Sequence, residues 1–137
     1  MAFQYSVAAR NAQLDAIEAT VGSAPVLEIR TGSAPATAAT ADSGTLLVSI
    51  TLPSDWMAAA SGGAKALSGS WSDTVATTGT AGHFRIKQGA TCHLQGSVSQ
   101  RAADGGSGDL QLDQATAGLV AGQVLTISAF TLTAGGA

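Results

Sequence analysis

The residue types best suited to chemistry gather in residues 82–99 (GHFRIKQGATCHLQGSVS), which hold both histidines and the only cysteine. Imidazole and thiolate groups are common zinc ligands, so His83, Cys92 and His93 are the first candidates for a metal site. Polarity alternates on both sides of Gly89, which is typical of strands with one buried and one solvated face. This pattern places both histidines on the solvated face and Cys92 on the buried face. We therefore expect no metal site here.

Nucleophiles and carboxylates form a second group of candidates, and their spacing argues against catalysis. Serines are plentiful, but no G-x-S-x-G elbow occurs, and Cys92 lies within a predicted strand rather than at a helix N-terminus that would activate its thiol. Asp104, Asp109 and Asp113 lie among glycines, yet they lack the spacing of an EF-hand loop and its closing glutamate. We predict a protein that is not an enzyme and has no cofactor.

The alternation in residues 82–99 predicts a β-hairpin. Phe84 and Ile86 on the first arm, and Leu94 and Val98 on the second, fall on the buried face together with Cys92. Directly opposed residues share a face, so their numbers must add to an even value. That parity requires a loop of odd length, most simply three residues around Gly89.

The other side of this hairpin is the most polar and basic strip in a chain of low charge. We predict that this strip, exposed to solvent, contacts a neighbouring protein molecule, and that the N-terminal helix supplies further contacts. The candidate protein-contact residues are Arg10, Asp15, Glu18, His83, Arg85, Lys87, His93 and Gln95.

Residues 6–21 are predicted to form the one long helix. Ser6 can cap its start, and Gly22 stands where a helix ends. An apolar stripe of about 80° on the helical wheel includes Leu14 and Val21. Arg10 falls inside that stripe, so we expect the stripe either to be partly solvated or to dock on a partner with an acidic group.

The rest of the chain predicts a mainly β protein: a single-domain antiparallel β-sandwich or compact, jelly-roll-like barrel. The run of small residues at 32–43 is expected to be a surface loop. A short helix is expected to begin at Ser54 and to bury Trp56. A β-bulge is expected near residues 128–129. The predicted strands are residues 26–31, 45–52, 67–72, 109–113 and 123–133 together with the hairpin. The predicted parts of the single domain are the N-terminal helix and arm (1–22), the β-sandwich (24–133) and a tail (134–137) with nothing of its own to pack against.

Composition limits the possible partners. Only 11% of the residues are charged, against about 25% in an average soluble domain, which favours a surface that contacts other protein. Six scattered Lys and Arg residues and a net charge of −3 disfavour nucleic acid. The chain lacks a long apolar run and a signal-like start, so we expect no membrane partner and synthesis in a cytoplasm.

Several segments resemble one family of proteins, namely MAFQYSVAARNAQLDAIEATVG, LEIRTG, DSGTLL, LPSDWMAAASGGAKALSGSW, GHFRI, TCHLQGSV and FTLTAG. They are similar to small proteins encoded among the virion structural genes of tailed bacteriophages and prophages. The resemblance covers most of the chain, although none of its motifs is a mechanistic fingerprint. It implies a component of the virion.

Composition and the single long helix suit a head decoration, or cement, protein better than a portal or tail-tube subunit. We expect a non-enzymatic homo-oligomer, a trimer, that binds the major capsid protein in the virion through its N-terminal segment and stabilises the head. An alternative is a tail, neck or fibre-attachment subunit. A third hypothesis is a carbohydrate-binding module in which Trp56 and Trp71 stack on sugars.

Overall fold

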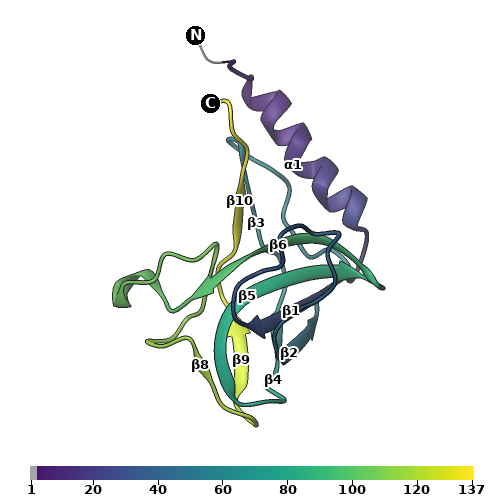
Figure 1. The fold of residues 1–137 in the computed structure, drawn as a ribbon. Coiled ribbons are helices and arrows are strands. Elements are labelled where there is room, and N and C mark those ends of the chain that lie inside the picture. The colour runs from purple at the N-terminus through teal and green to yellow at the C-terminus, as the bar shows by residue number, and fades with distance from the viewer. Residues whose placement is uncertain (1–2) are drawn as a thin grey trace.

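The computed structural model describes residues 3–137 and contains one α-helix, one short 3-10 helix and ten strands (Figure 1). Met1 and Ala2, the start of the predicted N-terminal arm, lie outside the described residues. The elements in chain order are α1 (Val7–Val21), β1 (Val26–Thr31), β2 (Leu46–Thr51), β3 (Ala64–Ala66), β4 (Trp71–Thr74), β5 (Gly79–Gln88), β6 (Thr91–Ser99), η1 (Ala102–Asp104), β7 (Leu110–Gln111), β8 (Gly118–Leu119), β9 (Val124–Ile127) and β10 (Thr131–Thr133).

The main sheet has the strand order β2-β1-β5-β6-β7, and β8 pairs with the start of β5. It curls into a half-barrel (Figure 1). The pairs β4–β9 and β3–β10 form two separate two-stranded sheets. The fold class is therefore the predicted one, mainly β with the architecture of a sandwich or barrel. The β6–β7 pair departs from the predicted antiparallel arrangement, because it is parallel. The segment between the two strands, which contains η1, crosses back so that β7 runs in the same direction as β6.

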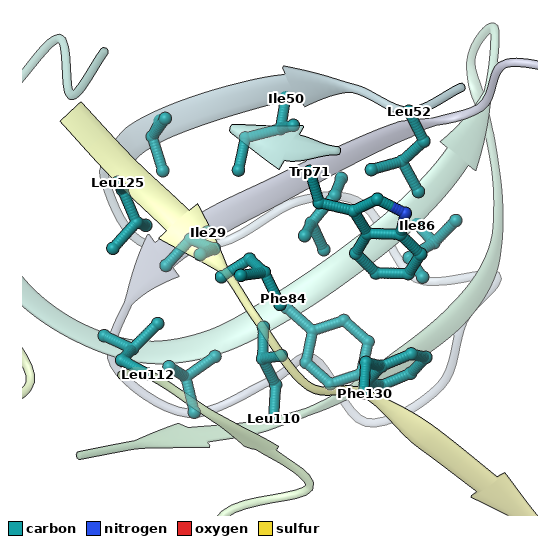
Figure 2. Close-up of a cluster of buried hydrophobic side chains, with 14 of the residues drawn as sticks. Ile29, Ile50, Leu52, Trp71, Phe84, Ile86, Leu110, Leu112, Leu125 and Phe130 are labelled. Atoms are coloured by element: carbon teal, nitrogen blue, oxygen red, sulfur yellow. The ribbon is translucent and has the colours of Figure 1, made fainter. Parts of the chain in front are cut away.

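The core combines aliphatic side chains of the strands with a cluster of aromatic side chains (Figure 2). The ring of Trp71 lies 6.1 Å from that of Trp56 and 5.6 Å from that of Phe130, and Phe84 meets Phe130 edge to face. Both indoles are fully buried and donate to backbone oxygens, Trp56 to Gly22 and Trp71 to Ser68, each at 3.1 Å. A sugar cannot stack on rings that no solvent reaches, so this structure removes the carbohydrate-binding hypothesis.

The predicted short helix at Ser54 is wrong. Residues 54–60 contain no helical turn: residues 54 and 55 form a bend, Met57 forms an antiparallel bridge with Leu67, and the N–H of Ala58 donates to the oxygen of Ala66 at 2.8 Å. This pairing satisfies the backbone while burying both Trp56 and Met57, which one isolated helical turn would not do. The strand predicted at 67–72 is mostly absent: Leu67 forms only the bridge to Met57, residues 68–70 belong to no strand, and β4 begins at Trp71.

The last predicted strand is also divided. Residues 123–133 form β9, which pairs with β4, and β10, which pairs with β3. Buried apolar side chains fall at odd-numbered positions up to Ile127 and at an even-numbered position at Phe130. This change marks the point where the chain changes its pairing partner, and the predicted β-bulge within one strand is wrong.

The hairpin of β5 and β6 is formed as predicted, but its loop is not. The loop has two residues, Gly89 and Ala90, and a bulge between Ile86 and Lys87 corrects the parity. Ile86 therefore stands opposite Leu94, whereas Lys87 stands opposite Cys92. The prediction failed because an odd-length loop and an even-length loop with one bulge give the same alternation of faces, so the alternation cannot tell them apart.

Helix α1 follows its sequence signals. Ser6 Oγ accepts from the N–H of Ala9 at 3.1 Å, and Gly22 ends the helix at a φ of 89°. The C-terminal tail, in contrast, is held by its own chain: Tyr5 N donates to Gly136 O at 2.7 Å and Ala134 N donates to Gly63 O at 3.0 Å. The helix, β3 and β10 thus form a projection that carries both ends of the chain (Figure 1).

Candidate protein-contact surface

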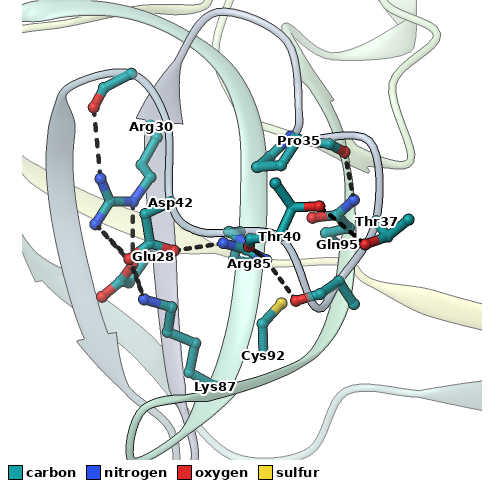
Figure 3. Close-up of polar contacts among 12 residues, drawn as sticks. Glu28, Arg30, Pro35, Thr37, Thr40, Asp42, Arg85, Lys87, Cys92 and Gln95 are labelled. Carbon is teal, nitrogen blue, oxygen red and sulfur yellow. Dashed lines mark hydrogen bonds and ion pairs between the residues drawn. The ribbon is translucent and has the colours of Figure 1, made fainter.

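The polar side of the hairpin is covered, contrary to the expectation that it faces solvent. His83 is 0% exposed and Arg85 is 1% exposed. The loop of residues 32–45 folds across this face of β1, β5 and β6 (Figure 3). His83 Nδ1 is 2.9 Å from the oxygen of Gly32. Sequence alternation identified a polar face correctly, but it could not show that a distant loop lies over it.

Arg85 holds this loop in place (Figure 3). Its Nη1 donates to Asp42 Oδ1 at 2.5 Å, and its Nη2 donates to the backbone oxygens of Ala38 at 2.7 Å and Thr40 at 2.9 Å. Gln95 Nε2 donates to the oxygen of Pro35 at 2.8 Å. A loop that lies on a sheet needs donors for its carbonyl groups, and these side chains supply them.

Three cations and two carboxylates complete the cluster beneath the loop. Lys87 Nζ pairs with Asp42 and, at 3.2 Å, with Glu28. Arg30 pairs with Glu28 at 3.1 Å and with Asp42 at 3.3 Å. The hydrogen bond from Lys87, against the opposing effect of burial and with help from Arg85, lowers the pKa of Asp42. These side chains therefore pair with one another and help to hold the loop on the sheet.

An open pocket of about 610 Å³ adjoins this cluster, between the loop and the turn of the hairpin. Cys92 lines it beside Arg85, because the bulge at Lys87 places the cysteine opposite a polar residue (Figure 3). Cys92 is half-buried and its thiol donates to the oxygen of Leu94 at 3.2 Å, so the expectation of a thiol in the apolar core is wrong. Within residues 3–137, His, Cys, Asp and Glu side chains form no group of three that could hold a metal ion.

The acidic turn residues also have partners within the chain. Asp109 Oδ2 accepts from the N–H and hydroxyl of Ser97, at 3.0 and 3.1 Å, and Asp104 pairs with Arg101 at 2.5 Å. These contacts stabilise the turns around η1 and β7.

The charged residues of α1 contact the segment that contains β3, although the side chain of Asp15 stays 52% exposed. Lys65 is 2% exposed and pairs with Asp15 at 2.7 Å and with Glu18 at 3.6 Å. The guanidinium of Arg10 lies close to Gly63, and its Nε is buried without a hydrogen-bond partner. Hydrogen bonding by Lys65, reinforced by the N–H of Ala60, lowers the pKa of Asp15.

The outer side of α1 carries little charge, and its one ionised side chain, Asp15, is 52% exposed while paired with Lys65. Four exposed alanines, spaced so that they share one side of the helix, form what we call the alanine stripe: Ala8, Ala12, Ala16 and Ala19. The other exposed residues of α1 are Val7, Gln13, Thr20 and Asp15, and Asp15 is bound to Lys65. Solvated helix faces normally carry charged side chains, so this face is unusual. The alanine spacing is visible in the sequence, and the contact prediction above did not use it.

Two apolar features continue this surface at opposite ends of α1. At the N-terminal end, Phe3, Tyr5 and Val7 are 88%, 47% and 47% exposed, and we call these three residues the apolar arm. At the C-terminal end, a groove of about 410 Å³ separates α1 from β6. The residues that line this α1–β6 groove are Gln13, Ala16, Ile17, Thr20, Val21, His93 and Leu94. Among the contact residues predicted in the hairpin, His93 lines this open groove.

No helix within residues 3–137 has the length and apolar character needed to cross a membrane. Comparison of the chain with protein-family models, curated proteins and solved structures finds no match in any of the three.

Proposed function

We propose that the protein is a non-enzymatic structural subunit of a bacteriophage virion, which works as a homo-oligomer and decorates the head by binding the major capsid protein. The observation that carries the proposal is the surface formed by the apolar arm, the alanine stripe and the α1–β6 groove. A surface that is poor in charge and exposes large apolar residues is typical of protein interfaces.

The distribution of charge supports a role in protein contact. Five of the six basic residues form ion pairs within the chain, and the sixth, Arg10, has its Nε buried. Few cations are therefore left to bind phosphates, and the charged groups that line the 610 Å³ pocket beside the loop are already paired with one another. Neutral, small-residue surfaces bind through shape and apolar burial, as a subunit that stabilises a capsid would.

The proposal is tested by adding the purified protein to heads assembled from the major capsid protein and sedimenting the particles. We expect saturable co-sedimentation, with a bound amount that scales with the number of capsid subunits, and heads that open at a higher temperature. Absence of binding to heads would overturn the decoration role. Binding restricted to tails or necks would replace it with the role of a tail, neck or fibre-attachment subunit.

A further inference from the structure

We propose that the pocket beside the loop of residues 32–45 is a modification site, in which Cys92 forms a mixed disulfide with a small acidic thiol. The co-reactant is a soluble disulfide that carries carboxylates, such as glutathione disulfide. The inference goes beyond the proposed function and does not depend on it. It rests on access to the thiol, on the room beside it and on the charge of the pocket wall.

The thiol of Cys92 stands in the wall of an open pocket and not in the apolar core. Its hydrogen bond to the oxygen of Leu94, at 3.2 Å, costs little to lose, because a thiol is a weak donor. The pocket volume of about 610 Å³ lies within the range of small-molecule sites. Most of the other lining residues are small: Ala38, Ala39, Thr40, Ala41, Ala90 and Thr91.

The charged cluster gives this pocket a positive wall. Three cations, Arg30, Arg85 and Lys87, are paired with only two carboxylates, which leaves a formal charge of +1 on the cluster. The chain as a whole has a net charge of −3, so the cluster is opposite in sign to the molecule around it. Such a local excess favours the approach of an anion over that of a cation.

Arg85 supplies a second observation that points to a ligand. Its side chain lines the pocket and is 1% exposed, and its Nε is buried without a hydrogen-bond partner among residues 3–137. Buried donors are nearly always bonded, so this one favours an acceptor from outside the chain. Burial opposes the charged guanidinium, but hydrogen bonding by Asp42 and then by Cys92 raises the pKa of Arg85. The guanidinium therefore acts on the sulfur as well as on Asp42.

The exchange balances with no further reagent. Cys92 loses its proton, and its sulfur attacks one sulfur of the acidic disulfide. The S–S bond of the reagent breaks while a new S–S bond forms to Cys92. The other half of the reagent leaves as a thiolate and takes up the proton. Cys92 is thus oxidised and the reagent reduced, and the carboxylates of the retained half lie beside Lys87 and Arg85.

Mass spectrometry of the full-length protein follows exchange with two reagents, glutathione disulfide, which is anionic, and cystamine, which is a cationic disulfide. The quantity compared is the ratio of their second-order rate constants, anionic over cationic. Lys87→Met leaves two cations and two carboxylates in the cluster, so we expect this ratio to fall at least about threefold. Arg101→Met is the matched control: it removes the same charge from an exposed pair outside the pocket and should leave the ratio unchanged.

Two further measurements keep the test decisive if Lys87→Met loosens the loop. Lys87→Arg keeps the charge and should keep the wild-type ratio. Added salt should lower the ratio of the wild-type protein itself, because it screens the cluster. Absence of an adduct on folded wild-type protein with either reagent would overturn the proposal, since the thiol would then be closed to ligands. A ratio that responds neither to Lys87→Met nor to salt would also overturn it, because Cys92 would then be an ordinary accessible thiol.

Discussion

Phe84 and Ile86 leave β5 on one side and pack among aliphatic and aromatic side chains, whereas His83 and Arg85 leave it on the other side and lie beneath the loop of residues 32–45. Both faces are buried. The first is covered by side chains that need no hydrogen bonds, and the second by a backbone segment that does. Polar residues in a strand can therefore indicate a face covered by a loop as well as a face covered by water.

The two faces also contribute to stability in different ways. On the apolar face, stability comes from the area removed from water and from close packing. On the polar face, the cost of desolvating Arg85 and Asp42 offsets much of their attraction, so the intact cluster adds little net stability. Removing one member is nevertheless costly, because its partners stay buried without hydrogen bonds. The following predictions test this contrast.

The largest effect is expected on the apolar face. Trp71→Ala removes a fully buried indole that contacts Trp56 and Phe130, and it should lower the free energy of unfolding by about 4 kcal/mol. Urea unfolding followed by circular dichroism measures the loss. Val124→Ala, at an exposed position on neighbouring β9, is the control and should change it by less than about 0.5 kcal/mol. A Trp71→Ala loss as small as that of the control would mean that this face is loosely packed.

Removing the central cation of the polar face should come next. Arg85→Met keeps the volume but leaves Asp42 and the oxygens of Ala38 and Thr40 without their donor, so we expect a loss of about 3 kcal/mol. Lys87→Met, in the same cluster but more exposed, should cost about 1 kcal/mol. Equal losses for the two variants would show that the backbone contacts of Arg85 contribute nothing beyond its charge.

Acid should weaken the polar face selectively. The pKa of Asp42 in the folded protein lies below its ordinary value of 3.8, so its stabilising effect is fully present above that pH and is lost as the pH falls through the folded pKa. We expect the stability of the wild type to fall more steeply below about pH 4 than that of Asp42→Asn. Unfolding curves at several pH values measure this difference. Parallel curves for the two proteins would contradict the assigned role of Asp42.

The smallest effect is expected at the rim of the loop. Gln95→Met removes the donor to the oxygen of Pro35 and should cost about 1 kcal/mol or less. Amide hydrogen exchange should quicken in residues 33–38 while the protection of β1 and β5 stays unchanged. Faster exchange throughout the sheet would show that the loop and the sheet open together instead of separately.

Much of the fold could be predicted from local pattern, and the exceptions have a common cause. The capped helix at residues 7–21, the hairpin arms and the buried aromatic anchors follow from spacing and side-chain type. The two-residue loop at Gly89 and the split between β9 and β10 depend on which strand pairs with which, and several pairings satisfy the same alternation. Trp56 was placed correctly in the core but in the wrong secondary structure for the same reason.

For the candidate contact residues, too, local pattern predicted some properties and tertiary contacts decided the others. Sequence alone determined that β5 has an apolar and a polar face and that α1 carries alanines along one side, because both depend only on the geometry of a strand and a helix. Tertiary structure decided that the polar face is covered and the alanine side is free. The loop reaches Arg85 across more than forty residues of chain, and Lys65 draws the charges of α1 inward from fifty residues away. Those contacts form only when distant segments meet, which no local pattern records.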